Sequence, residues 1–484
     1  YHLLRNYLQH EARLLELRVR DQEEYEPYIP FAKVIIDLEE ARKRMETLVP
    51  AQAASTLNTL VQQTQQSHRE AATREKPALY VANRASLAVT QLQTHLRQWH
   101  QFYQDYDPLY SWWCSEPYKA VDAALTQYSR WLRETLAEIR TAEEIVGDPI
   151  GREMLLSELA YEMIHYTPEE LVKIAEQEYA WCEAEMKKAS QEMGLGEDWK
   201  QALEKVKTLH VEPGQQPGMI RDLAWEAIDY VTRHDLVTVP ELCRNTWRME
   251  MLSPERQLVS PFFLGGEVIM VSFPTSGMQH EQKLMSMRGN NRYFSRATVH
   301  HELIPGHHLQ MYMQARFRPY RQLFATPFWM EGWALYWEML LYQRGFARTP
   351  EERVGMLFWR MHRCARIVFP LRFHLSTMPP EQCIEYLVER VGHERANATA
   401  EVRRSFSGMY GPLYQAAYML GGLQMRALRQ EFVESQRMTE KAFHDQVLQQ
   451  NSIPLELVRA SLQGQPLPRE FPVQWRFYGE VEQK

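Results

Sequence analysis

The stretch HHELIPGHH, residues 300–308, places four histidines and a glutamate together in a chain that has 17 histidines among 484 residues. In the H-E-x-x-H helix of zinc peptidases, two histidines one turn apart bind one ion, and the glutamate acts on the water beside it. Glu302 follows His301 directly, as that chemistry requires. The stretch therefore predicts a single catalytic Zn²⁺ ion, with His301 as a ligand and Glu302 as the general base.

The spacing departs from that helix, because Pro305 stands four residues after His301 and the next histidine is His307. On an ideal helix, a step of six residues leaves the two rings about 120° apart. Rings so oriented cannot share one ion through bonds of about 2 Å. Proline disfavours helical geometry at the preceding residue, and glycine relaxes the backbone. We therefore expect a helix break at Pro305-Gly306 that brings His307 to the metal.

Two further histidines belong to the same stretch. His308 is the alternative second ligand, because a step of seven residues keeps it on the face of His301, although about 10 Å along an intact helix. We prefer His307 as the ligand and expect His308 to support the site from outside the ligand set. His300 faces away from His301 and is expected to pack or to orient a neighbouring group.

A catalytic zinc usually takes three protein ligands and a water molecule. The segment FWMEGWALYWEMLLY, residues 328–342, is apolar nearly all round and is expected to be a buried helix opened by Thr326-Pro327. Buried carboxylates are costly unless they are paired or bound to a metal. We therefore expect Glu331 to be the third ligand. Glu338, two turns further along, is expected to hold a ligand imidazole.

Helical patterns dominate the chain on both sides of a short interruption. Residues 1–250 are expected to form an almost entirely helical region that covers the cleft. The segment EVIMVSF, residues 267–273, is β-branched and apolar and is the best strand candidate. Helical patterns then return, with a capping box at TPEE, residues 349–352. The sequence thus predicts a mainly α protein whose catalytic region, 251–484, carries a small β insert before the histidines.

Composition and charge argue against several classes of protein. The chain is 45% hydrophobic and 24% charged, with a net charge of −7, which is typical of a folded globular protein and argues against nucleic-acid binding. No apolar run approaches the roughly 20 residues that a membrane span needs. Five widely spaced cysteines are expected to be buried free thiols. The chain does not begin with methionine, which is compatible with a removed upstream export signal, so the sequence leaves both a cytoplasmic and an exported location open. It does not determine the oligomeric state.

The segments TVHHELIPGHHLQ (298–310), EGWALY (331–336) and YMLG (418–421) together resemble the bacterial family known as domain of unknown function 885. The resemblance runs through most of the chain, and the H-E-x-x-P-G-H-H block is its specific signature. It implies a mostly helical, zincin-like fold of the gluzincin type with a long internal cleft. It also implies a zinc peptidase of the carboxypeptidase or oligopeptidase kind, with His301, His307 and Glu331 as ligands and Glu302 as the base.

A peptidase also needs groups that contact its peptide substrate. Tyr418 is the candidate donor to the developing oxyanion, with Tyr410 and Tyr414 as alternatives beside the substrate. Arg403 and Arg404 are candidate cations for a terminal carboxylate, and the resemblance favours Arg404. The strand at 267–273 is expected to lie at the cleft edge and to pair with an extended peptide.

Three other functions are compatible with parts of the pattern. The same zinc site suits a hydrolase of a non-peptide amide or ester. A catalytically inactive zincin-fold binding protein is the second alternative, and the intact Glu302 speaks against it. Glu162-x-x-His165 suggests a di-iron bundle, but such a fold needs a second Glu-x-x-His, and the sequence has none. His165 is therefore expected to pack or to cap a helix.

Overall fold

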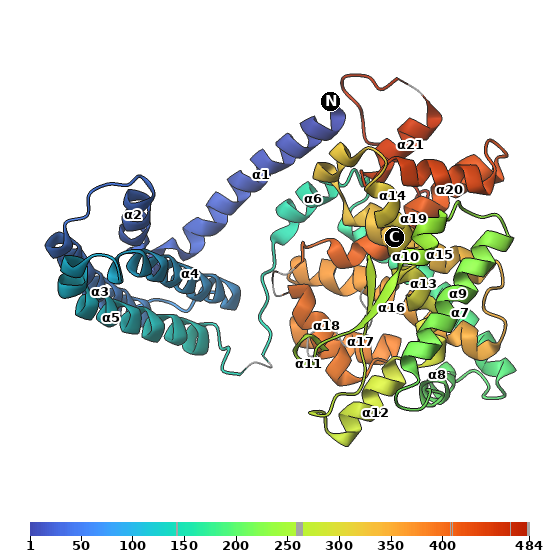
Figure 1. Cartoon of the computed structure of the whole chain (residues 1–484), viewed down its shortest axis with the longest axis horizontal. Coiled ribbons are helices and arrows are strands. Elements are labelled where there is room, and N and C mark those ends of the chain that lie inside the picture. Colours follow the sequence, from blue (N-terminus) through green and yellow to red (C-terminus); the bar gives the residue numbers. More distant parts are fainter. Residues whose placement is uncertain (142–143, 258–264, 407, 409, 465, 482–484) are drawn as a thin grey trace. The chain divides into compact units, whose positions relative to one another are not determined.

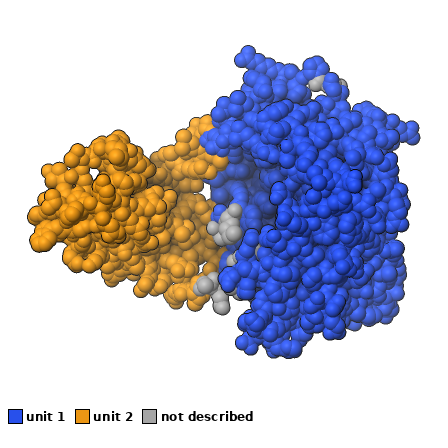
Figure 2. Space-filling view, in the orientation of Figure 1, with its two compact units in different colours: residues 1–11, 150–484 blue, residues 12–149 orange. Residues whose placement is uncertain are grey.

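The computed structural model describes residues 1–484 except 142–143, 258–264, 407, 409, 465 and 482–484. The chain divides into two compact units, which Figure 2 shows in different colours. Unit 1 comprises Tyr1–Glu11 and Ile150–Lys484, and unit 2 comprises Ala12–Pro149. The boundary expected near residue 250 does not coincide with this division. Residues 150–250 belong to unit 1 because their helices pack on those that follow, above all α7 (Pro168–Glu192) on α16 (Pro350–His374).

Unit 2 is a set of helices around an apolar core of its own. Fully buried Leu57, Val89 and Leu125 come from three of these helices. Asp107 begins one of them by accepting hydrogen bonds from the amides of Leu109 and Tyr110. The elements are most of α1 (His2–Tyr25), then η1 (Glu26–Tyr28), α2 (Ala32–Lys43), α3 (Pro50–Thr73), α4 (Leu79–Gln104), α5 (Pro108–Trp131) and η2 (Leu132–Leu136).

Unit 1 is mainly helical as well, so the expected mainly α class is confirmed (Figure 1). The helices before the histidines are α6 (Gly151–Tyr161), α7 (Pro168–Glu192), α8 (Trp199–Thr208), α9 (Gln216–Arg233), α10 (Glu241–Thr246), α11 (Pro254–Gln257) and α12 (His280–Gly289). The site region contains α13 (Arg292–Glu302), α14 (His307–Gln314), η3 (Pro319–Phe324), α15 (Pro327–Gln343) and α16 (Pro350–His374). The chain then forms α17 (Pro380–Val391), α18 (Arg395–Phe406), α19 (Tyr414–Arg429), η4 (Gln430–Glu434), α20 (Glu440–Gln449) and α21 (Leu455–Gln463).

The β insert anchors directly to the helix that carries the histidines. β1 (Arg248–Met251) and β2 (Val268–Val271) form a parallel pair, with Arg248 opposite Val268. β2 confirms the strand expected at 267–273, whereas β1 was not expected, because it is only four residues long and largely exposed. Ile269 and Val271 are fully buried in a cluster that includes Val299 of α13. The sheet is therefore packed against α13, the helix that carries His301.

A close helix crossing positions the residues of α15 and α19. A Cβ atom on Gly332 would lie 2.6 Å from the Cα of Gly421, so only glycine lets the two helices approach this far. Thr326 caps α15 by accepting a hydrogen bond from the amide of Phe328, as expected from Thr326-Pro327. The crossing places α19 against the part of α15 that carries Glu331.

Two expectations about the whole chain can be compared with the described residues. The five cysteines are free and buried, as expected. Within the described part of the chain, no helix has both the length and the apolar character needed to cross a bilayer.

Candidate metal centre

The histidine stretch folds as two helices with a break between them. α13 ends at Glu302 and α14 begins at His307, so the expected interruption at Pro305-Gly306 is present. The amide of Gly306 donates to the carbonyl of His300 at 3.0 Å, and the Trp333 indole donates to the carbonyl of Pro305 at 2.8 Å. A Cβ atom at position 306 would collide with the His301 carbonyl. Glycine is therefore required where the chain turns back.

The break brings His301 and His307 onto one carboxylate. Their Nε2 atoms lie 3.5 and 3.2 Å from Oε2 of Glu331, and the two rings stand at 86° to each other. Ligand atoms at the corners of a tetrahedron with bonds of 2.0–2.1 Å are about 3.3 Å apart. Both nitrogen–oxygen distances are thus close to the spacing between two ligands of one zinc ion.

The opposite ring nitrogens are held by other side chains. Nδ1 of His301 lies 2.7 Å from Glu338 of α15, the contact expected for Glu338. Nδ1 of His307 lies 3.2 Å from Oε1 of Gln310, one turn along α14. A partner at Nδ1 leaves the Nε2 lone pair for a metal. This role of Gln310 was not expected from the sequence, although a residue three positions after His307 lies on the same face of a helix.

The two carboxylate oxygens of Glu331 differ in their hydrogen bonding. Its Oε1 accepts a hydrogen bond of 2.5 Å from the Tyr414 hydroxyl, whereas its buried Oε2 has no hydrogen-bond donor among the described residues. Burial opposes ionisation, yet the two imidazoles hold the pKa of Glu331 well below its usual range. Burial also opposes charge on His301, but Glu331 and Glu338 raise its pKa to about 9. The surroundings therefore favour positive charge between the two rings.

Glu302 is the second carboxylate within reach of the histidines. A carboxylate oxygen of Glu302 and one ring nitrogen each of His301 and His307 lie within 4.8 Å of one another, so this glutamate is an alternative ligand. Glu331 is the better third ligand, because its oxygen faces both Nε2 atoms at the spacing of a coordination tetrahedron. Burial raises the pKa of Glu302 above its usual range, which suits a group that takes up a proton.

The remaining histidines of the stretch point elsewhere. Both ring nitrogens of His308 lie 3.1 Å from backbone carbonyls, those of Gly266 and Cys243, so the ring ties α14 to the β insert. His300 places Nδ1 2.7 Å from the carbonyl of Arg296, one turn back on α13. Burial lowers the pKa of His300 to about 4, which keeps its ring neutral. Neither ring reaches Glu331 among the contacts that the structure records.

The predicted tyrosines gather beside the cluster. Tyr418 stacks on His301 with 5.9 Å between ring centroids, and Tyr414 donates to Glu331. Tyr410 stacks on Tyr414 at 4.4 Å, and the Arg404 guanidinium lies 5.2 Å from the Tyr410 ring. Tyr414 thus donates a hydrogen bond to a candidate ligand, which was not expected from the sequence.

A group of buried charges behind Tyr418 was also missed from the sequence. The guanidinium groups of Arg363 and Arg366 lie 4.5 and 4.7 Å from the Tyr418 ring. Glu401 accepts a hydrogen bond of 2.7 Å from Arg366 and lies 3.6 Å from Arg404. Arg366 belongs to α16 and Glu401 to α18, 35 positions further along the chain, so local spacing could not reveal their contact.

The di-iron alternative does not fit the structure. α6 ends at Tyr161, so Glu162 and His165 lie in the turn that follows and share no helix face. Glu162 is buried and accepts a hydrogen bond from the Thr326 hydroxyl, whereas His165 is exposed. The two side chains therefore do not converge on a common ion.

Comparisons with known proteins agree on family and fold. The model of the family described as "Bacterial protein of unknown function (DUF885)" matches residues 1–462. A "putative lipoprotein of unknown function" from Shewanella oneidensis is similar in structure, with a TM-score of 0.65, 17% identity and coverage of 95% of this chain and 92% of that one. A second "putative lipoprotein", from Colwellia psychrerythraea, has a TM-score of 0.59 and 18% identity. This match covers 85% of this chain and 75% of that one. No functionally curated protein matches significantly.

Proposed function

The chain belongs to the bacterial DUF885 family, and we propose that it is a zinc-dependent peptidase of the zincin type. One observation carries the proposal: two imidazole nitrogens and an otherwise unsatisfied buried carboxylate oxygen converge at 3.2 and 3.5 Å. A buried carboxylate oxygen without a donor is costly unless a cation completes it. His₂Glu is a ligand set of catalytic zinc, which keeps its fourth position for water.

The residues around the ion each have a distinct task. Zinc, when bound, supplies Lewis-acid chemistry, which lowers the pKa of a water molecule and polarises a substrate carbonyl. His301, His307 and Glu331 would hold it, and Glu338 and Gln310 fix the orientation of the two imidazoles.

Glu302 provides the proton transfers. Its carboxylate is close to both histidines, and its raised pKa favours uptake of a proton from the attacking water. The same carboxyl then returns the proton to the leaving amine of the peptide bond. Tyr418 remains the candidate donor to the carbonyl oxygen, because its ring stacks directly on His301.

Arg404 and β2 are the candidate substrate contacts of this centre. Arg404 lies over Tyr410, next to the tyrosine that contacts Glu331, so a substrate carboxylate bound by Arg404 would lie near the ion. Tyr410 and Tyr414 would form an aromatic wall for the same part of the substrate. β2 would offer its backbone to an extended peptide.

The direct test is hydrolysis of a panel of short peptides by the native protein and by Glu302→Gln, with bound zinc measured in both. We expect Glu302→Gln to keep its zinc and to lose activity by a factor of about 10²–10⁴, because only the proton carrier is removed. Glu169→Gln, at an exposed glutamate of α7, serves as the matched control and keeps full activity. Full activity in Glu302→Gln would contradict the proposal.

A further inference from the structure

One pocket of unit 1 is bordered by the end of β2 and by α11, α12 and α18. Its volume is about 540 Å³, which lies within the range of ligand-binding pockets. We call it the α12–α18 pocket. Its walls carry mostly amide, hydroxyl, methionine and alanine side chains, among them Ser286, Met285 and Asn397. Such a wall suits uncharged ligand groups that need hydrogen bonds.

One wall of this pocket leads to the metal centre along β2. A Cβ atom on Gly265 would lie 2.7 Å from the Cα of Glu302, so the chain touches the candidate base there. From Gly265 the chain runs through β2 to Ser272, which lines the pocket. The seven steps from Gly265 to Ser272 span at most about 23 Å of extended chain. Among the described residues, the backbone of β2 pairs with β1 alone, so its other edge has no strand partner.

A second wall leads to the same centre along α18. Ala400 lines the pocket, and Arg404 follows one turn later, about 6 Å along the helix. Arg404 lies over Tyr410, which stacks on Tyr414, and Tyr414 donates to Glu331. The pocket is thus connected to the candidate ligands by two independent sets of contacts.

We propose that the α12–α18 pocket is a substrate subsite that takes uncharged residues of an oligopeptide, about five to seven residues from the bond cleaved at the metal centre. The inference rests on the proposed peptidase function and names its substrate class. The peptide pairs with the open edge of β2 and ends in the pocket. A substrate that reaches both the pocket and the metal centre is therefore an oligopeptide.

The charge and hydrogen bonding of the pocket define what it accepts. Among the described lining residues, Glu255 is the only ionisable one, so an acidic substrate residue meets repulsion and finds no cation. Ser286 has a buried hydroxyl without a hydrogen-bond partner, and this hydroxyl is available to a peptide group or an amide side chain. Neutral polar residues are therefore favoured over acidic ones.

The test measures binding, which does not depend on turnover. A dye-labelled peptide of about eight alanine, serine and asparagine residues is titrated, by fluorescence anisotropy, into Glu302→Gln and into the same protein carrying Ala400→Phe. We expect the added ring to fill the pocket and weaken binding at least about tenfold. Equal affinity in the two proteins would overturn the subsite.

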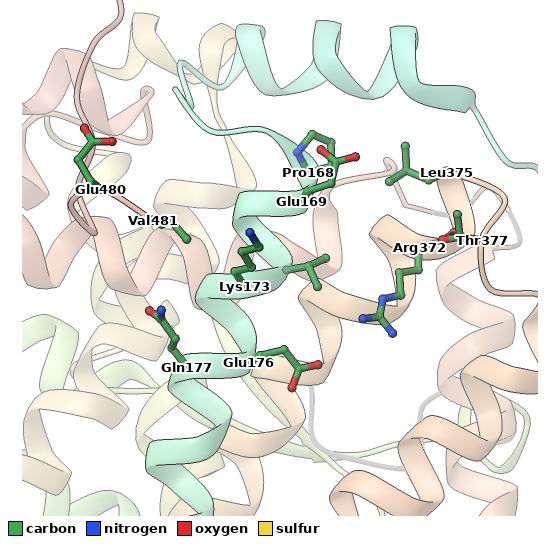
Figure 3. A pocket seen from close by; sticks show the side chains of 11 residues that line it. Pro168, Glu169, Lys173, Glu176, Gln177, Arg372, Leu375, Thr377, Glu480 and Val481 are labelled. Carbon is green, nitrogen blue, oxygen red and sulfur yellow. Dashed lines mark hydrogen bonds between the residues drawn. The ribbon is translucent and has the colours of Figure 1, made fainter. Parts of the chain in front are cut away.

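A matched control uses another hollow of unit 1. Figure 3 shows a pocket of about 810 Å³ lined by residues of α7 and the end of α16, including Lys173 and Arg372. Val172→Phe fills this pocket with the same ring and is expected to leave the affinity for the peptide unchanged. An equal loss in Val172→Phe and Ala400→Phe would show a general disturbance and would also overturn the assignment.

A surface variant keeps the inference testable if Ala400→Phe does not fold. Glu255→Lys reverses the charge of the exposed lining residue, so a peptide with a central aspartate should gain affinity and one with a central lysine should lose it, each by about threefold or more. Unchanged affinities would contradict the subsite. If the native protein binds these peptides but neither binds zinc nor cleaves any peptide, the proposed function fails while the subsite stands.

Discussion

Two buried groups of histidine and glutamate lie in unit 1, and they use the same residue types differently. At the metal centre, the Nε2 atoms of His301 and His307 face an oxygen of Glu331 that has no hydrogen-bond donor. The two imidazoles therefore face a carboxylate oxygen that has no hydrogen-bond donor among the described residues. A bound cation would complete such an oxygen.

In the second group, which we call the His362–His393 pair, the charge of the carboxylate is balanced by an arginine side chain. Nε2 of His393 lies 2.9 Å from Nδ1 of His362, and the neighbouring Glu401 accepts a hydrogen bond of 2.7 Å from Arg366. Burial lowers the pKa of His393 to about 3, and Arg366 helps to keep that of Glu401 near 2 in spite of burial. The partner of the carboxylate, and not the residue types, thus separates a candidate metal site from a structural one.

The largest effect is expected from removing the carboxylate of Glu331, whose Oε2 faces both imidazoles of the metal centre. Glu331→Ala should reduce bound zinc from about one ion per chain to near zero and abolish hydrolysis, because two imidazoles alone hold zinc weakly. Elemental analysis after dialysis against a weak chelator measures this. Stoichiometric zinc in Glu331→Ala would remove the distinction between the two groups.

Removing the charge of the carboxylate in the second group should lower the stability of the fold and leave the metal content unchanged. Glu401→Gln leaves the buried guanidinium of Arg366 without its counter-ion and should lower the free energy of unfolding by about 3–5 kcal/mol. Zinc content should stay at the native level. Chemical denaturation gives the first quantity, and loss of zinc from the folded variant would show that the second group belongs to the metal site.

A third buried carboxylate sharpens the comparison, because it has neither an imidazole nor a guanidinium beside it. Burial raises the pKa of Glu162 from 4.5 to about 8, although the Thr326 hydroxyl donates to it. Its favourable contribution is complete below pH 4.5 and is lost as the pH rises through about 8.

Replacement of this group should therefore remove part of the pH dependence of folding. Glu162→Gln should stabilise the protein by roughly 3 kcal/mol at pH 8 relative to pH 5, since one pKa unit is worth about 1.4 kcal/mol. Thermal unfolding at the two pH values measures the difference. A native-like pH dependence in Glu162→Gln would indicate that Glu162 is ionised in the folded state.

The smallest effect concerns the carboxylate that orients a ligand without binding the ion. Glu338→Gln keeps a partner at Nδ1 of His301 but removes the charge, and it should weaken zinc binding by about 10–100-fold. Competition with a fluorescent chelator resolves such a change. A loss as large as that of Glu331→Ala would mean that Glu338 itself contributes to the ligand set.

Local sequence rules predicted much of unit 1. The caps at Thr326 and Thr349 predicted the starts of α15 and α16, because Thr-Pro satisfies the first turn of a helix. The spacing of His301 and His307 required a break, and Pro305-Gly306 supplied the residues that permit it. Burial of Glu331 and Glu338 followed from the apolar surroundings of both residues on α15.

Features formed between distant segments could not be predicted in this way. β1 is four residues long and largely exposed, so its pairing with β2 could not be recognised from a local pattern. The ion pair of Glu401 with Arg366 joins α18 to α16, and the contact of Gly332 with Gly421 joins α15 to α19. The unit boundary near residue 149 had one signal, the turn-forming Gly147-Asp148-Pro149.

The central claim is that His301, His307 and Glu331 form a zinc site and that His308 lies outside it. Zinc stoichiometry in His307→Ala and His308→Ala tests it most directly, because the two variants differ by one position. We expect His307→Ala to lose its zinc and His308→Ala to keep it, because both ring nitrogens of His308 lie beside backbone carbonyls, those of Gly266 and Cys243. Stoichiometric zinc in His307→Ala together with its loss in His308→Ala would contradict the account.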